Sequence, residues 1–124
     1  MSSGNETQSE YPTPLDNSPW EVTPQEVHQL VHKGEDFLLL DCRTSMEWED
    51  GSIHNAIHLP LQQFSTRFNE IETHREKPIV VFCKSGNRSV IVAKFLQLAG
   101  FRHVRSMSGG YEQWLTIATA NGAS

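Results

Sequence analysis

An alternation of short apolar runs with helical segments constrains this chain more than any other feature of its sequence. The runs "DFLLLDC" (36–42) and "IVVF" (79–82) show no polar alternation, which is typical of strands buried on both faces of a sheet. A helical pattern follows each run, over 44–51 and over 89–100. Strands that alternate with helices predict an α/β domain, with a parallel sheet and helices on both faces.

The remaining elements are shorter. Thr23 with Glu26, and Thr44 with Glu47, have the spacing of capping boxes and predict the starts of two helices. Further strands are expected over 55–60 and 103–107, and further helices over 61–73 and 111–118.

The two ends of the chain differ from its middle in composition. Residues 1–18 are rich in Ser, Asn, Glu and Pro, which predicts a flexible tail. We expect one folded domain over 19–118 and a second loose tail over 119–124.

Charge and cysteine content narrow the class of protein. The 124 residues carry ten Lys plus Arg against fifteen Asp plus Glu, a net charge of −5, which argues against nucleic acid and anionic membranes as partners. The N-terminus shows no signal peptide, and the apolar runs are too short to span a bilayer. Two cysteines without a Cys-x-x-Cys pair predict neither a zinc knuckle nor a thioredoxin motif. A cytoplasmic protein with two free thiols, a monomer by default for its size, is the expectation.

Cys83 stands where a buried strand is followed by a helix. The loop "CKSGNRS" places Lys84, Ser85, Gly86, Asn87, Arg88 and Ser89 directly after it. Unpaired amides at a helix N-terminus carry partial positive charge, Gly86 permits a tight curl, and Lys84 and Arg88 add two cations. These features favour a thiolate, so we expect a depressed pKa for Cys83 and a nucleophile that needs no separate base.

Three segments, in order, resemble the rhodanese (thiosulfate sulfurtransferase) family. They are "LLLDCRTSMEWEDGSIHNAIHLPL", the loop "CKSGNRS" and "GFRHVRSMSGGYEQW". Together they span about residues 20–117, and three motifs in the right order are far more specific than one. The resemblance implies a five-stranded parallel sheet flanked by helices on both faces.

The resemblance also implies the chemistry of a sulfurtransferase. Cys83 would take a sulfane sulfur from an anionic donor, thiosulfate or a persulfide, and hold it as its own persulfide. A thiol, cyanide or a partner protein would then accept that sulfur. Residues 84–89 would bind the donor. From their position in the loop alone, we expect the hydroxyls of Ser85 and Ser89 to donate toward the outer sulfur. No metal and no organic cofactor is implied.

Two alternatives share the fold. Rhodanese-fold phosphatases and arsenate reductases resemble one another in a Cys-x5-Arg loop, whereas Cys83 and Arg88 are separated by four residues. A shorter ring of amides suits one sulfur better than a tetrahedral oxyanion. A non-catalytic docking module is the other alternative, and the presence of Cys83 argues against it.

The second strand is expected to end in the triplet Asp41, Cys42 and Arg43. Asp41 and Arg43 are predicted to support the loop through hydrogen bonds and ion pairs. Related phosphatases have a cysteine in this triplet that pairs with the catalytic cysteine. Cys42 is therefore a candidate redox partner of Cys83. Ordinary rhodaneses more often carry valine at this position, so a valine-sized filler is the alternative interpretation.

Five other side chains and one glycine pair have simpler interpretations. His28 and His32 are four residues apart but lack a third metal ligand. His58 is a weak candidate for approaching the site. The remaining candidates are two core aromatics and a glycine pair that lets the backbone pass close to the loop: Trp48, Trp114, Gly109 and Gly110.

Overall fold

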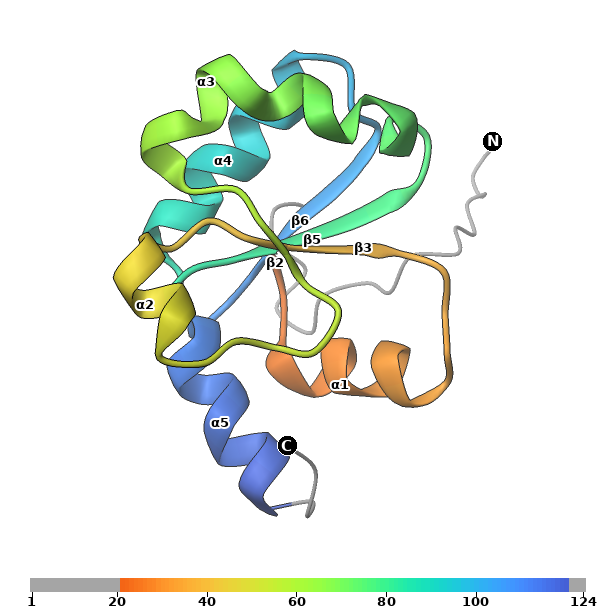
Figure 1. Cartoon of the computed structure of the whole chain (residues 1–124). Helices are drawn as coiled ribbons and strands as arrows, with labels where there is room; N and C mark the ends of the chain where they lie inside the picture. The colour runs from red at the N-terminus through yellow and green to blue at the C-terminus, as the bar shows by residue number, and fades with distance from the viewer. Residues whose placement is uncertain (1–20, 121–124) are drawn as a thin grey trace.

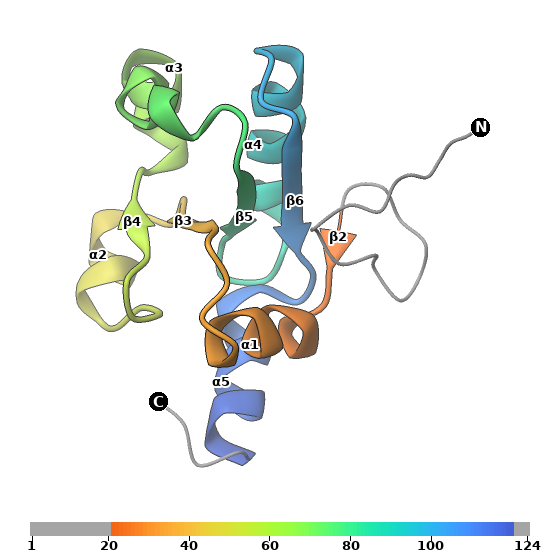
Figure 2. The same ribbon diagram turned by 90° about the vertical axis from the view of Figure 1, so that its right-hand side faces the viewer.

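The structure, a computed structural model, describes residues 21–120. Its centre is a sheet of five parallel strands in the order β2-β6-β5-β3-β4 (Figures 1 and 2). In that order, the strands are β2 (Glu21–Val22), β6 (His103–Met107), β5 (Pro78–Phe82), β3 (Leu38–Asp41) and β4 (Ile57–His58). The predicted five-stranded parallel sheet is confirmed.

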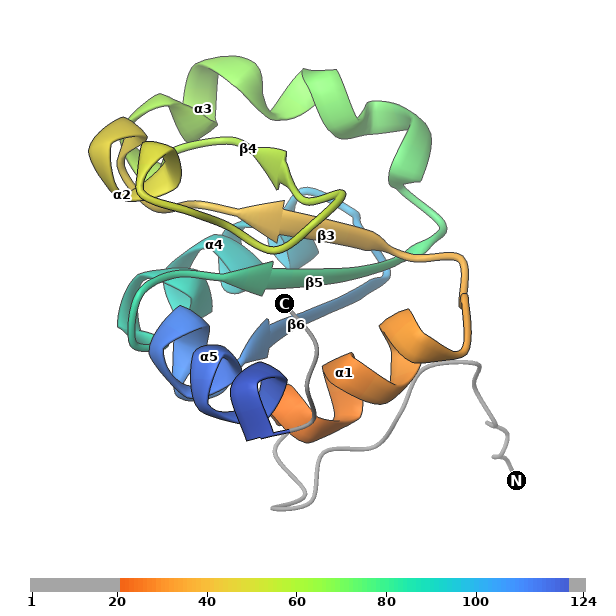
Figure 3. The same ribbon diagram turned by 60° about the horizontal axis from the view of Figure 1, so that its bottom comes forward.

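Helices cover both faces of the sheet (Figure 3). On one face α1 and α5 pack side by side, and on the other lie α4 and the segment that contains α3. The bounds are α1 (Pro24–His32), α2 (Ser45–Glu49), η1 (Leu61–Gln63), α3 (Phe64–Arg67), η2 (Phe68–His74), α4 (Asn87–Leu98) and α5 (Gly110–Ala120). Within residues 21–120, none of these helices combines the length and the apolar character that crossing a bilayer requires.

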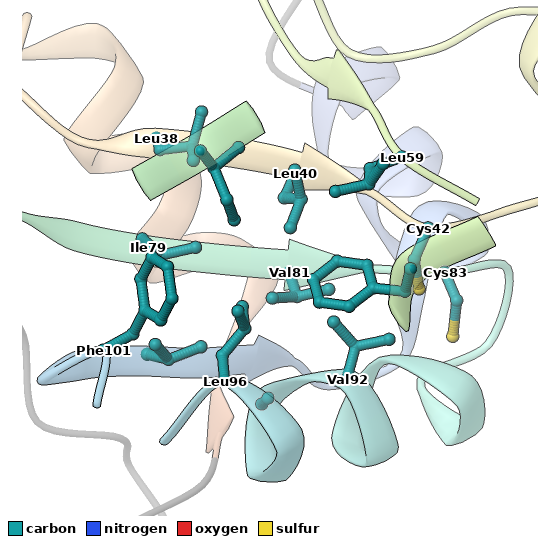
Figure 4. Packing of buried hydrophobic residues seen from close by; sticks show 14 residues of the cluster. Leu38, Leu40, Cys42, Leu59, Ile79, Val81, Cys83, Val92, Leu96 and Phe101 are labelled. Atoms are coloured by element: carbon teal, nitrogen blue, oxygen red, sulfur yellow. The ribbon is translucent and has the colours of Figure 1, made fainter. Parts of the chain in front are cut away.

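The two central strands explain the uninterrupted apolar runs. Leu40 pairs with Val81, and both have no exposed surface. Side chains alternate between the two faces, so each strand contributes to two separate cores. The cluster on the α4 side is drawn in Figure 4; the other cluster lies under α1 and α5.

Both predicted capping boxes are confirmed. In the first, the Glu26 amide donates to Thr23 Oγ1 over 3.1 Å, and the Thr23 amide donates to Glu26 Oε1 over 2.8 Å. Thr44 and Glu47 repeat the arrangement at α2. These local bonds satisfy amides that a helix N-terminus leaves unpaired, which is why the sequence alone locates both starts.

The segment predicted as one helix over 61–73 is broken into η1, α3 and η2. Ile71 has non-helical backbone angles, φ −109° and ψ 18°. None of the three pieces has a side-chain cap, and weak helix formers such as Ser65, Thr66 and Asn69 interrupt the segment. Buried Phe64 and Ile71 hold it against the core instead.

Several boundaries also differ from the prediction. The strands expected over 36–42 and 55–60 shorten to β3 and β4, and α5 continues to Ala120, two residues past the expected end of the domain. The sequence does not predict strand β2, because a strand of two residues with one buried side chain, Val22, is too short to show an apolar pattern. The N-terminal tail predicted over 1–18 and the last four residues lie outside the described part of the chain.

Candidate active site

Cys83 lies between β5 and α4, at the carboxyl edge of the sheet. The Gly86 amide donates to its sulfur over 3.1 Å and the Ser89 amide over 3.4 Å. Gly86 is the N-cap of α4 with φ 103°, a left-handed conformation that favours glycine. The loop therefore curls two backbone donors around the sulfur at the positive end of a twelve-residue helix.

A chain of two buried serines also reaches the sulfur. Ser89 Oγ lies 3.4 Å from Cys83 Sγ, and Ser106 Oγ lies 2.7 Å from Ser89 Oγ. Sequence reasoning named Ser89 but missed Ser106. The available signal was one small polar residue at an inward position of β6, between buried Val104 and Met107.

Cys42 lies beside Cys83, one residue past the end of β3. Its amide donates to the Phe82 carbonyl over 3.0 Å, which continues the register of β3 with β5 by one residue. The two cysteines lie side by side in the same core cluster (Figure 4), and both are free thiols.

These contacts fix the protonation of the pair. The hydrogen bond from Cys42 is the largest influence on the pKa of Cys83 and lowers it; burial acts in the opposite direction, and the Ser89 hydroxyl with the Ser89 and Gly86 amides lowers it further. The net result is a pKa well below the ordinary range of a thiol. The pKa of Cys42 is raised instead, by its hydrogen bond to Cys83 and by burial.

The two cations of the loop, Lys84 and Arg88, have different surroundings. Arg88 forms a two-bonded ion pair with Glu47 of α2, with N–O distances of 3.1 and 3.2 Å. Hydrogen bonding to Arg88 lowers the pKa of Glu47 to about 2. Lys84 is exposed. Neighbouring hydrogen-bond donors are therefore the largest influences that lower the pKa of Cys83, and the attraction between Arg88 and Cys83 is a smaller one.

Asp41 and Arg43 form a buried pair beside the site. Their closest N–O distance is 2.7 Å, Ser52 also donates to Asp41, and Arg43 donates to the Gly51 carbonyl. The Arg43 guanidinium lies 4.3 Å from the ring centre of Tyr111. The pair thus links β3, the segment after α2, and α5. Within the described residues, neither side chain forms a hydrogen bond or ion pair with Cys83.

The start of α5 packs against the base of the loop. The Tyr111 amide donates to the Cys83 carbonyl over 2.8 Å, and the Glu112 amide donates to the Lys84 carbonyl over 3.1 Å. A Cβ on Gly110 would lie 2.5 Å from the Cys83 carbonyl oxygen. The close backbone approach expected of the glycine pair is confirmed for Gly110.

The other candidate residues lie away from the sulfur or open to solvent. Ser85 and Asn87 are exposed, and no hydrogen bond joins the Ser85 hydroxyl to Cys83 in the described structure. His58 stacks on Trp48 and hydrogen-bonds the Arg43 carbonyl. The prediction of Trp48 as a core aromatic is wrong, because it stacks on His58 while remaining partly exposed; Trp114 is buried as expected. No cluster with metal-ligand geometry occurs within residues 21–120.

Comparison with known proteins agrees with this geometry. Residues 23–117 match the Rhodanese-like domain family. The chain is 35% identical over 97 residues to "Thiosulfate sulfurtransferase GlpE" of Coxiella burnetii, covering 76% of this chain and 85% of that protein. It is 33% identical over 94 residues to a "Sulfurtransferase" of Allochromatium vinosum, covering 76% and 86%.

A solved structure shows the same fold. The crystal structure of a rhodanese-related protein from Thermoplasma volcanium superposes with a TM-score of 0.71 at 25% identity, over 85% of this chain and 95% of that one. The fold, the loop around Cys83 and these relatives lead to one conclusion: the chain belongs to the rhodanese-like domain family.

Proposed function

We propose that this protein is a sulfurtransferase that carries sulfane sulfur as a persulfide on Cys83. The observation that supports this most directly is the set of groups around one sulfur: the Gly86 and Ser89 amides hydrogen-bond to it, and the neighbouring Cys42 lowers its pKa. Donors fixed before the reaction stabilise an anionic sulfur without reorganisation. The relatives named as sulfurtransferases support the same class of reaction.

The proposed first step loads the enzyme. The Cys83 thiolate attacks the outer sulfur of thiosulfate, the S–S bond of thiosulfate breaks, and sulfite leaves with the electron pair of that bond. Cys83 then holds a persulfide anion whose charge lies on the outer sulfur. A persulfide donor reacts in the same way and releases its own thiolate.

In the second step, the acceptor attacks the outer sulfur. Cyanide leaves as thiocyanate, or a thiolate leaves as a persulfide, and the bonding electrons return to Cys83 as thiolate. The Gly86 and Ser89 amides stabilise the anion at the start and at the end of the cycle. No step requires a metal or an organic cofactor.

In this proposal, the charged residues of the loop and the residues beside it bind the donor or support the site, and none of them reacts. Lys84, exposed at the mouth of the site, attracts the anionic donor. Arg88 chiefly anchors the loop to Glu47. Asp41 and Arg43 support the site through Tyr111, whose amide binds the Cys83 carbonyl.

A direct assay tests the proposal. Wild-type protein incubated with thiosulfate should gain about 32 daltons on Cys83 and should convert cyanide to thiocyanate. Cys83→Ser should do neither, whereas Leu98→Ala, at a side chain that is 90% exposed on the far part of α4, should behave as wild type. Hydrolysis of an aryl phosphate without thiocyanate formation would favour the phosphatase alternative. Absence of both activities would favour a docking module.

The wider setting is also a proposal. Both cysteines are free, which fits a reducing cytoplasm. We propose a monomer with its domain over residues 19–118, small anionic sulfur donors, and thiols, cyanide or a partner protein as acceptors. Light scattering at micromolar concentration tests the monomer, and capture of sulfur-loaded protein in cell extract tests the acceptors.

A further inference from the structure

Ser106 and Ser89 form a hydroxyl pair that the reaction described above does not use. Both side chains are fully buried, and their oxygens are 2.7 Å apart. Ser106 lies on β6 between two neighbouring strands, paired in register with Val81 on one side and Glu21 on the other. Its position is therefore set by the sheet, whereas Ser89 lies in the first turn of α4.

Counting protons shows which state of Cys83 this pair suits. Each hydroxyl has one proton to donate and two lone pairs to accept. When Cys83 is a thiolate, Ser106 donates to Ser89 and Ser89 donates to the sulfur, so every proton in the chain has an acceptor. When Cys83 is protonated and donates to Ser89, three protons share the two contacts, so one hydroxyl proton of the pair has no acceptor among the hydrogen bonds within residues 21–120.

A buried hydroxyl without an acceptor costs free energy, so the pair favours the anionic sulfur. We infer that Ser106 is a positioning residue: it orients the Ser89 hydroxyl toward the sulfur of Cys83. The effect on the resting thiolate does not depend on the proposed function. Only its extension to catalysis rests on that function: the oriented Ser89 hydroxyl would also stabilise the Cys83 thiolate that each turnover regenerates.

Other groups also act on Cys83 and must be held constant in a test. Cys42 approaches from the end of β3, and Arg88 with Glu47 approaches from α4 and α2. Asp41 acts on Cys42. None of these residues hydrogen-bonds to Ser106 in the described structure, so substitutions at 106 leave their contacts unchanged.

The experiment follows the thiolate in the resting protein. Thiolate absorbance near 240 nm, or the rate of alkylation by iodoacetamide, is recorded across acid to neutral pH, with Cys83→Ser as the baseline. In Ser106→Ala, the titration midpoint of Cys83 should rise enough to lower the thiolate fraction about three- to tenfold at a fixed pH below the midpoint. Ser89→Ala should shift it at least as far.

The double variant separates positioning from general loosening. If Ser106 acts through Ser89, Ser89→Ala/Ser106→Ala should match Ser89→Ala alone. Val104→Ala, at a fully buried position on the same strand and facing the same cluster, should lower the melting temperature without moving the midpoint. A wild-type midpoint in folded Ser106→Ala, or additive shifts in the double variant, would overturn the inference.

A second pair of variants keeps the test decisive if alanine prevents folding. Ser106→Thr and Ser106→Val have nearly the same shape and differ in one hydroxyl. The threonine variant should keep the wild-type midpoint and the valine variant should raise it; equal midpoints would contradict the inference. Because the titration needs no sulfur donor, a shifted midpoint alongside a failed thiocyanate assay would reject only the proposed function.

Discussion

At the scale of single residues, the site depends on neutral donors that surround one sulfur. A thiol beside it, Cys42, contributes more than the loop cations to the low pKa of Cys83. Hydrogen bonds to an anion are roughly twice as strong as those between neutral groups, so small side chains suffice to hold a buried thiolate. This places Cys42 in the electrostatics of the site, beyond the filler role that its size suggests.

Replacing Cys42 tests that role through pH dependence. Because the pKa of Cys83 is depressed, its thiolate persists through neutral pH and is lost only as the pH falls through the lowered value. Cys42→Val removes the donor, so the acid limb of the alkylation rate should move to higher pH. Cys42→Ser keeps a donor and should move it less. Identical acid limbs in wild type and Cys42→Val would rule out this contribution.

Oxidation offers a second test at Cys42. We propose that mild peroxide converts Cys83 to a sulfenic acid, which the Cys42 thiol attacks to give a disulfide and water. Adjacent register on β3 and β5 brings the two side chains close enough for such a bond. Mass spectrometry should show a loss of two daltons that a reductant reverses. In wild-type protein, sulfinic acid on Cys83 with no crosslink would contradict the proposal. In Cys42→Val, which cannot form the disulfide, sulfinic acid on Cys83 is the expected product.

At the scale of elements, α2 and α5 hold the loop from two sides. Glu47 of α2 pairs with Arg88, and the start of α5 binds the carbonyls of Cys83 and Lys84. Neither contact can be predicted from the sequence, because each joins residues that are far apart along the chain. Glu47 and Arg88, for example, are 41 positions apart. Long-range contacts of this kind form only once the strands are in register.

Glu47→Gln tests the contact between α2 and α4. Gln can keep the capping box with Thr44, so the change chiefly removes the ion pair, whose partly exposed position suggests a cost of about 0.2–1 kcal/mol. The pKa of Glu47 is lowered in the folded state, so its contribution is complete above the unfolded value and disappears as the pH falls through about 2. Denaturant unfolding at neutral and acid pH should show the two proteins converging in acid. A constant difference across that range would contradict this assignment.

Gly110→Ala tests the contact of α5 with the loop. Its φ is 61°, and the added Cβ would meet the backbone of Cys83 and Lys84, so we expect a cost of about 2–5 kcal/mol and a large loss of sulfur transfer. Gly34→Ala is the matched control: it has φ 71° but nothing within 4 Å of an added Cβ. That change should cost about 1–2 kcal/mol and leave transfer intact. Thermal unfolding and the thiocyanate assay distinguish the two variants. Equal losses of stability and activity in Gly110→Ala and Gly34→Ala would refute a role for the close contact between Gly110 and the loop.

At the scale of the whole molecule, local signals predicted more than distant contacts did. The capping residues Thr23 and Thr44 located two helix starts, and Cys83 with its glycine loop located the site, because short-range chemistry determines each. Ser106 and the thiol of Cys42 acquire roles only when β6 and β3 flank β5. The 3-10 turns after residue 60 escaped prediction because packing of Phe64 and Ile71 replaces helix propensity there.

The two hydrophobic cores share β3 and β5. We therefore expect both faces of the sheet to unfold together, in one cooperative transition. Leu40 faces the α4 side while its neighbour Leu39 faces α1 and α5, so loss of packing on one face should destabilise the other through the same backbone. Leu40→Ala should cost about 2–5 kcal/mol, against a change within about 0.5 kcal/mol for exposed Leu98→Ala. Unfolding followed by tryptophan fluorescence and by far-ultraviolet circular dichroism should give one coincident transition in each protein. Two separated transitions in Leu40→Ala would show instead that the two faces unfold independently.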